Sequence, residues 1–157
     1  MKAWRVQRPG SIDGEPLKMV EEPPPRPGIG EILLAVDACA VCRTDLHVVE
    51  GDLPVHLPHV VPGHEIVGRV HALADDAELG VEVGDRVAVD IVWYGPPSDG
   101  NPFGVRCYGY SFGLDEGAGL WGGYGEYMAV LPGTHLARLT DDLSAQPGQL
   151  RKDQVLT

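Results

Sequence analysis

The sequence predicts a mainly β domain in which short, mostly antiparallel strands form a distorted barrel. The first observation is composition: 21 glycines and 14 prolines make up about 22% of the chain, where about 12% is usual. This content of turn-forming residues favours short strands and loops over a helical bundle. The second observation is periodicity, because several segments alternate apolar and polar residues, whereas helical character is confined to short stretches.

The first strands alternate clearly. Residues 2–6 (KAWRV) predict a half-buried strand, and residues 17–20 (LKMV) a second short one. The proline-rich segment 23–30 is predicted to be an extended connection, since proline lacks the amide donor that a sheet requires. Residues 31–40 form the most regular predicted strand. One face of that strand is predicted to carry alternating apolar residues, namely Ile32, Leu34, Val36 and Ala38.

The middle of the chain continues this pattern. Residues 43–50 have helical character, and Gly51 ends the helix. Residues 66–73 predict another strand, and residues 86–89 predict the next one after a turn at Gly84.

The last third is less regular. Residues 93–119 read as a long, glycine-rich loop without a clear period, followed by a strand at 124–131 and a possible last strand at 136–139. From residue 144 onward the pattern becomes polar, which predicts a frayed, disordered tail. We therefore expect one domain over residues 1–143 and a tail over 144–157.

Charge excludes two classes of partner. Twelve basic residues and 23 acidic ones give a formal net charge of -11. Such a surface repels phosphate groups, so neither nucleic acid nor an anionic membrane is an expected partner. No segment approaches the ~20 apolar residues of a membrane span, and residues 1–10 lack the apolar core of a signal peptide. Three cysteines, an odd number, do not suggest a disulfide framework, so we expect a reducing cytoplasm.

Two clusters contain the residues with metal-binding chemistry: residues 39–47 (CAVCRTDLH) and residues 62–68 (PGHEIVG). Together they offer a thiolate, an imidazole and a carboxylate, a mixed ligand set that suits zinc.

In the first cluster, the opening turn of a helix would place residues three apart on one face. Cys42 would then lie beside Asp45, a carboxylate able to accept the spare N–H of a ligating histidine. Thr44 would lie beside His47, and a hydroxyl next to an imidazole has the composition of a proton relay.

In the second cluster, His64 and Glu65 would point to opposite faces of a regular strand. A bend at Pro62-Gly63 would let both approach one ion. Gly68 suggests a close approach of two backbones.

Alternatives remain open at this point. Cys39 and Cys42 could form a redox pair, although that motif belongs to a helix start in a βαβ setting. They could also be half of a four-cysteine zinc site, but the chain has no second pair. Spacing alone leaves a metal site and a structural role both open. The remaining histidines are expected to be structural or surface residues: His56, His59, His71 and His135.

Four motifs in this order resemble the medium-chain zinc-dependent alcohol dehydrogenases: C-R-T-D-x-H, P-G-H-E-x-x-G, V-G-D-R-V and G-G-Y-G-E-Y. The resemblance covers residues 1–143 and corresponds to the N-terminal GroES-like catalytic domain of that family. It implies a GroES-like distorted β-barrel with one or two short helices. It also implies an oxidoreductase that interconverts a small alcohol and its aldehyde by hydride transfer to NAD(P).

The resemblance also implies roles for single residues. Cys42 and His64 would be ligands of one catalytic zinc ion, and Glu65 an intermittent or alternative ligand. Thr44 and His47 would relay the hydroxyl proton of the substrate.

Three further residues have implied positions. Arg43 matches a position near the pyrophosphate of the cofactor, and Asp45 matches the carboxylate behind the zinc ligands. Cys39 would be only a core thiol.

The chain differs from the family in its length, which affects the expected cofactor and activity. Its length leaves no room for a Rossmann domain, so NAD(P) would bind only if that domain is supplied elsewhere, by a partner or another copy. The chain is expected to be truncated and inactive alone, with a bare docking face that promotes association.

The chain also lacks cysteines that serve as zinc ligands in the family. The family's remaining catalytic ligand, a cysteine beyond this domain, is missing, and Cys107 is the one spare thiol. For the same reason we expect no structural zinc in the region of residues 93–112. The alternative function is a non-catalytic zinc-binding or partner-binding GroES-like module, since a fold does not fix a function.

Overall fold

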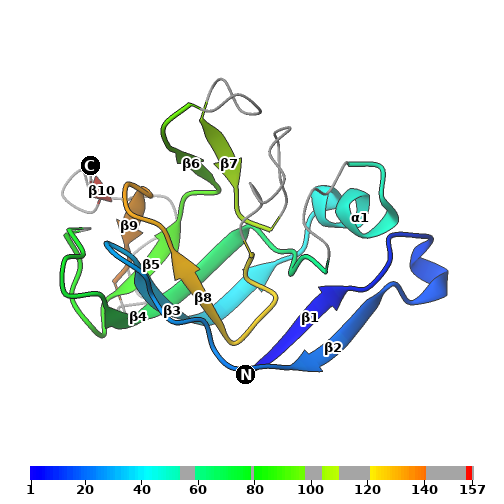
Figure 1. Cartoon of the computed structure of the whole chain (residues 1–157), viewed down its shortest axis with the longest axis horizontal. Helices are drawn as coiled ribbons and strands as arrows, with labels where there is room; N and C mark the ends of the chain where they lie inside the picture. Colours follow the sequence, from blue (N-terminus) through cyan, green and yellow to red (C-terminus); the bar gives the residue numbers. More distant parts are fainter. Residues whose placement is uncertain (54–58, 79, 98–103, 110–120, 141–154, 157) are drawn as a thin grey trace.

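The computed structural model describes residues 1–53, 59–78, 80–97, 104–109, 121–140 and 155–156. Within these ranges the chain is mainly β, with one short α-helix and a 3₁₀ turn, as predicted (Figure 1). No helix of the described part is long and apolar enough to cross a membrane. The strands are β1 (Lys2–Val6), β2 (Leu17–Glu21), β3 (Ile32–Ala40), β4 (Glu65–Leu73), β5 (Arg86–Val89), β6 (Val92–Tyr94), β7 (Val105–Cys107), β8 (Tyr127–Val130), β9 (Leu136–Arg138) and β10 (Val155–Leu156). The helices are the 3₁₀ turn η1 (Ile12–Gly14) and α1 (Arg43–Glu50).

Antiparallel pairing organises the strands into three sheets. The main sheet has six strands in the order β10-β9-β5-β4-β3-β8, and β1–β2 and β6–β7 form two separate hairpin-like pairs. In the described residues the two outer strands of the main sheet, β10 and β8, do not pair with each other, so the predicted distorted barrel is not closed there. The strand β3 is central, since it pairs with β4 along its whole length and with β8 at its beginning.

A β-bulge in β3 changes which residues face the core. Val36 pairs with Gly68 and Ala38 pairs with Val67, which leaves Asp37 as an extra residue. An extra residue reverses the alternation of side chains beyond it. Ala38 is therefore exposed, so the prediction of one apolar face through Ala38 was wrong, and Cys39 packs against the core instead.

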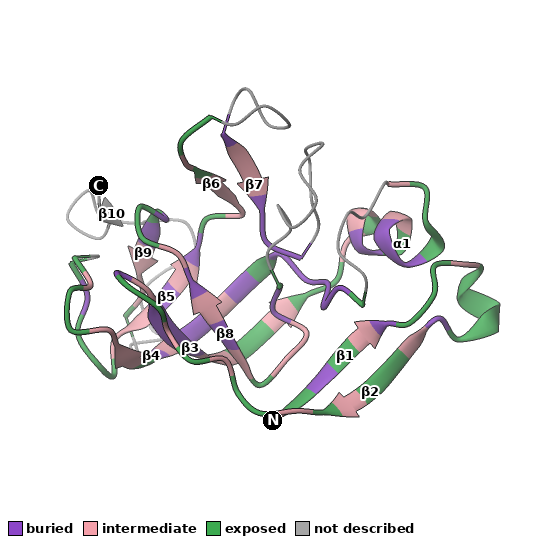
Figure 2. Ribbon diagram, in the orientation of Figure 1, coloured by how far each residue is buried: buried purple, intermediate pink, exposed green. Residues whose placement is uncertain are grey.

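Two hydrophobic clusters hold the elements together. Figure 2 marks the buried residues of these elements in purple. The larger one fills the space inside the main sheet, where Ile32, Leu34 and Val87 are fully buried. The smaller one fixes α1 against β1 and β7. Its buried members are Val6, Val48, Val49, Val60 and Cys107.

The segment predicted as a loop over residues 93–119 contains part of a hairpin, because β6 pairs with β7. Its strands have three residues each, too short to show a period. Side chains connect this hairpin to the main sheet: Trp93 Nε1 donates to the Pro132 carbonyl at 2.6 Å, and the buried Tyr108 hydroxyl pairs with Thr134 Oγ1 at 2.7 Å. Residues 98–103 and 110–119 lie outside the described part.

The C-terminal strands differ slightly from their predicted bounds. The strand predicted at 124–131 begins only at Tyr127, because the residues before it form irregular backbone against residues 61–63. The predicted last strand is present as β9, and Val155 of β10 pairs with Ala137. The rest of the predicted tail, 144–154 and 157, lies outside the described residues.

Candidate metal centre

Cys42 is held at the first turn of α1 by a capping box. Its backbone is extended (φ -125°, ψ -178°), and its Sγ accepts a hydrogen bond from the Thr44 N–H at 3.3 Å. In return, Asp45 Oδ2 accepts the Cys42 N–H at 2.9 Å. This reciprocal arrangement satisfies two amide groups that a helix start would otherwise leave unpaired. It also fixes the direction of the Cys42 thiol.

Asp45 connects the helix to the loop that contains His64. The residue is only 3% exposed. Oδ1 accepts the Gly63 N–H at 3.1 Å and lies 3.3 Å from His64 Nδ1. A buried carboxylate is stable only when such partners replace water.

His64 faces Cys42 with its other ring nitrogen. The imidazole is buried, and Nε2 lies 3.1 Å from Cys42 Sγ. Since Nδ1 faces the Asp45 carboxylate, we assign the ring proton to Nδ1, which leaves the Nε2 lone pair directed at the thiol. A thiol and an imidazole lone pair that converge in this way, with a carboxylate behind the ring, match the pattern of a zinc site.

Glu65 completes the cluster. It is the exposed first residue of β4, and one ligand atom each from Cys42, His64 and Glu65 lie within 4.8 Å of one another. Bonds of about 2.0 to 2.3 Å to a tetrahedral zinc ion place ligand atoms about 3.5 Å apart, so a modest movement of the exposed Glu65 side chain would fit all three to one ion. The sulfur, nitrogen and oxygen donors are those that zinc accepts.

The bend predicted at Pro62-Gly63 is present, and it requires glycine for two reasons. Gly63 has a φ of +97°, which side chains rarely adopt. A Cβ there would also lie 2.5 Å from Cδ1 of Tyr124 and 2.8 Å from Cys39 Sγ. The close approach predicted at Gly68 is confirmed as well, because a Cβ there would lie 2.4 Å from the Ala35 carbonyl oxygen.

A second segment, residues 121–125, supports the His64 loop. The amides of Gly123 and Tyr124 donate to the carbonyls of Gly63 and Pro62 at 2.9 and 3.0 Å. The Tyr124 ring then covers Gly63. The sequence analysis placed this segment in a family motif and at the start of a predicted strand, and it missed Tyr124 as a neighbour of the site. The adjacent glycines at 122–123 were the available signal, since they permit such close backbone contact.

The remaining predicted residues lie on α1 itself. Thr44 is half-buried beside Cys42, Arg43 is exposed, and His47 lies one turn further on. The His47 imidazole pairs with Asp52, with 2.9 Å between Nδ1 and Oδ2. The structure records no direct Thr44–His47 hydrogen bond between these two described side chains.

All three cysteines are free thiols. The pKa of Cys39 rises from 9.0 to about 12, chiefly because burial penalises the thiolate and next because of the Asp45 charge. A neutral thiol packed against the core supports the expected role of Cys39 and disfavours a redox pair with Cys42. Cys107 is buried in the smaller hydrophobic cluster, and the metal-binding group found among the described residues does not include it.

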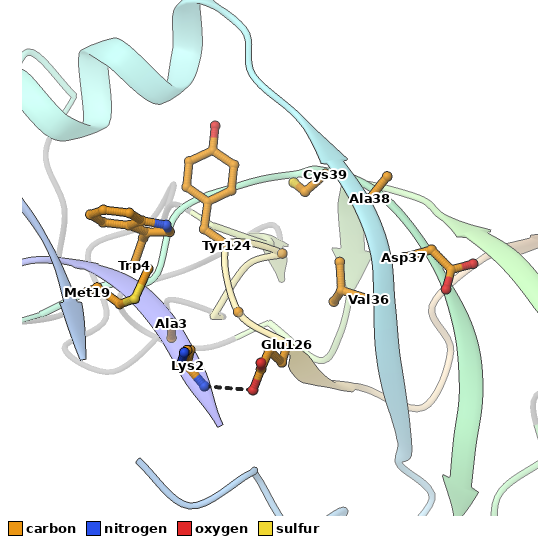
Figure 3. A pocket seen from close by; sticks show the side chains of 12 residues that line it. Lys2, Ala3, Trp4, Met19, Val36, Asp37, Ala38, Cys39, Tyr124 and Glu126 are labelled. Carbon is orange, nitrogen blue, oxygen red and sulfur yellow. Dashed lines mark hydrogen bonds between the residues drawn. The ribbon is translucent and has the colours of Figure 1, made fainter. Parts of the chain in front are cut away.

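A shallow pocket of about 340 Å³ lies next to the site, between β1, β3 and residues 123–126. Figure 3 shows Tyr124 and Cys39 along one side of this pocket, with the Tyr124 hydroxyl pointing away from Lys2 and Glu126. The Lys2 amide donates to Glu126 Oε2 at 2.8 Å and joins the two walls.

Comparisons with known proteins agree with this geometry. The model of the alcohol dehydrogenase GroES-like domain matches residues 28–141. "Probable alcohol dehydrogenase AdhA" of Mycobacterium tuberculosis (strain CDC 1551 / Oshkosh) is 55% identical over 93 residues, which cover 57% of this chain and 27% of that protein. An NAD-dependent alcohol dehydrogenase of Sulfurisphaera tokodaii is 34% identical over 134 residues, covering 74% of this chain and 35% of the relative.

A solved structure shows the same fold. The cobalt- and zinc-bound thermostable alcohol dehydrogenase from Pyrobaculum aerophilum has a TM-score of 0.67 and 30% identity, over 83% of this chain and 39% of its own. The chain thus spans roughly a third of the length of the relatives that it matches. Since the family model covers most of the sequence and the fold agrees, the chain belongs to the family of alcohol dehydrogenase GroES-like domains.

Proposed function

We propose that this chain is the metal-holding catalytic domain of a zinc-dependent, NAD(P)-linked alcohol dehydrogenase that interconverts a small alcohol and its aldehyde. The observation that carries the proposal is the convergence of Cys42 Sγ and His64 Nε2 at 3.1 Å, with a buried carboxylate behind the imidazole. The names of the similar proteins, which mention NAD, cobalt and zinc, support the choice of cofactors.

Cys42, His64 and Glu65 would hold one zinc ion, with Asp45 fixing the His64 ring. Zinc bound there would supply Lewis-acid chemistry that lowers the pKa of an alcohol hydroxyl. Cys42 is set by the helix start and His64 by the glycine bend, so these two side chains are in place before any ligand arrives. Glu65 is exposed and free to approach or leave.

Thr44 and His47 would move the proton released by the alcohol. Thr44 lies next to Cys42 at the helix start, and His47 lies one turn further on at a side-chain exposure of 35%, paired with Asp52. As the Thr44 hydroxyl accepted this proton it would release its own toward His47, and His47 would then release a proton to solvent. Arg43, exposed at the first helical residue, would bind the pyrophosphate of the cofactor.

The nicotinamide would be held by a Rossmann domain outside these 157 residues, in a longer chain or a partner chain. We therefore expect these residues alone to show no turnover of alcohol. The second candidate function is a zinc-binding or partner-binding module without catalysis. It is favoured by exposed apolar side chains on either side of Cys42, with Val41 at 70% and Leu46 at 36% exposure. Three free thiols agree with the reducing cytoplasm as the location.

The test is the zinc content of the purified chain by elemental analysis. We expect about one zinc ion per chain in the parent and almost none in Cys42→Ser, because a serine hydroxyl is a poor zinc ligand. Cys39→Ala is the matched control: it removes a thiol from the same motif and should keep its zinc. A parent without zinc, or loss of zinc in Cys39→Ala but not in Cys42→Ser, would overturn the proposed metal site.

A further inference from the structure

The Asp45 carboxylate has one unused position. A carboxylate offers about four lone-pair positions for hydrogen bonds. Three face described partners: the Cys42 N–H on Oδ2, the Gly63 N–H on Oδ1, and His64 Nδ1, also on Oδ1. With Asp45 only 3% exposed, bulk water does not supply a fourth partner.

A buried hydroxyl lies next to this carboxylate. The Tyr124 ring covers Gly63, whose own amide is bound to Asp45. Among the described residues, no partner of the enclosed Tyr124 hydroxyl meets strict hydrogen-bond geometry, but the Asp45 carboxylate lies close enough to interact with it. The pKa of Tyr124 is raised, chiefly by burial, next by the charge of Asp45 and then by a side-chain hydrogen bond with Asp45, which favours the protonated phenol as a donor. Figure 3 shows the hydroxyl directed away from the pocket walls at Lys2 and Glu126.

We propose that Tyr124 is a positioning residue whose hydroxyl donates to the open position on Asp45 and thereby orients His64 toward the metal. A buried donor without an acceptor and a buried acceptor position without a donor are both unfavourable, and a small rotation of the hydroxyl toward Asp45 removes both deficits. An Asp45 carboxylate fixed by the two backbone amides and by the Tyr124 hydroxyl keeps the His64 proton on Nδ1 and the lone pair on Nε2. This inference rests on the proposed metal site.

Tyr124→Phe tests the proposal because it removes only the hydroxyl and keeps the ring over Gly63. Tyr127→Phe is the matched control: its ring lies on β8 and contacts His71, with 5.1 Å between ring centroids. Zinc affinity of the full chain would be measured by competition with a chromogenic chelator. We expect Tyr124→Phe to bind zinc about 3- to 10-fold more weakly, less than the 10- to 100-fold typical of groups that contact a metal ligand directly. Tyr127→Phe should stay within about twofold, and an equally small change in Tyr124→Phe would overturn the proposal.

A spectrum of the metal-free chain separates this proposal from the metal site itself. Long-range proton–nitrogen NMR reports the His64 tautomer. The parent and Tyr127→Phe should show the Nδ1–H form, and Tyr124→Phe a mixture of tautomers. If the parent binds no zinc but the tautomer shifts as expected, the metal site fails, and what stands is the effect of Tyr124 on the His64 ring through Asp45. An unchanged tautomer in Tyr124→Phe would refute that role.

A double-mutant cycle tests whether Tyr124 acts through Asp45. In an Asp45→Asn background, Tyr124→Phe should weaken zinc binding by less than about twofold further, since the coupled partner is already changed. A full additional loss of about 3- to 10-fold would show that Tyr124 acts independently of Asp45 and would overturn the mechanism.

Discussion

Gly63→Ala should damage both the fold and the candidate metal centre, and the structure separates its two causes. The first is backbone conformation, because Gly63 has a φ of +97°. The second is space, because the new Cβ would lie 2.5 Å from Cδ1 of Tyr124 and 2.8 Å from Cys39 Sγ. Gly84 offers a matched control, with a φ of +96° and no atom within 4 Å of the position that a Cβ would take.

The magnitude follows from adding the two costs. Placing alanine in the left-handed region costs about 1 to 2 kcal/mol, and overpacking a close-packed site costs about 1 to 3 kcal/mol. We therefore expect Gly63→Ala to lower the free energy of unfolding by about 2 to 5 kcal/mol, and Gly84→Ala by about 1 to 2 kcal/mol. For a domain of this size each kcal/mol corresponds to about 2 to 4 °C in melting temperature.

Urea denaturation of both variants, followed by circular dichroism, measures this difference. Chelator competition on the same samples should show weaker zinc binding in Gly63→Ala only, since Gly84 lies in a turn before β5. If the two variants lose equal stability, the contacts of Tyr124 and Cys39 with Gly63 contribute nothing, and the reasoning about close packing is wrong.

Two more predictions concern a thiol and an exposed patch. Because the pKa of Cys39 rises from 9.0 to about 12 on folding, the unfolded chain releases this proton first. The difference in free energy of unfolding between the parent and Cys39→Ala should therefore be largest below about pH 9 and shrink as the pH rises toward 12. Urea denaturation at each pH measures this difference. A difference that stays constant with pH would contradict the prediction. Val41→Asp should reduce self-association in sedimentation experiments, since Val41 is 70% exposed beside the site, whereas Val83→Asp, at 63% exposure in a distant turn, should not. Equal effects of both changes would argue against a docking face around Cys42.

The sequence predicted those parts of the site that depend on local signals. The helix over residues 43–50 was recognised from its character and from Gly51, and the structure gives it the same bounds. The helix start and the glycine bend, each visible within a few residues, predicted the local geometry of each cluster, whereas the ligand set of Cys42, His64 and Glu65 came from the family resemblance.

The rest depends on contacts between distant segments, which no local pattern shows. The support that residues 121–125 give to the His64 loop joins parts of the chain that are far apart in the sequence. The reversed face of β3 at Asp37 was missed because a bulge adds one residue without changing the apolar character of the strand. The hairpin of β6 and β7 was missed because its strands are too short for alternation to appear.

The bulge at Asp37 has a consequence for how this domain tolerates changes in length. Asp37 is held in place by Arg86, at 3.2 Å between Oδ2 and Nε. Beyond this anchor β3 continues to Ala40, with Cys39 close to Gly63, and Cys42 follows two residues later as the first residue of the helix cap. Inserting or deleting one residue between 37 and 42 would exchange inward and outward positions and carry the Cys42 thiol away from His64. Turns such as the one at Gly84 have room to vary in length. The stretch from Asp37 to Cys42 does not, because its number of residues determines whether the Cys42 thiol reaches His64.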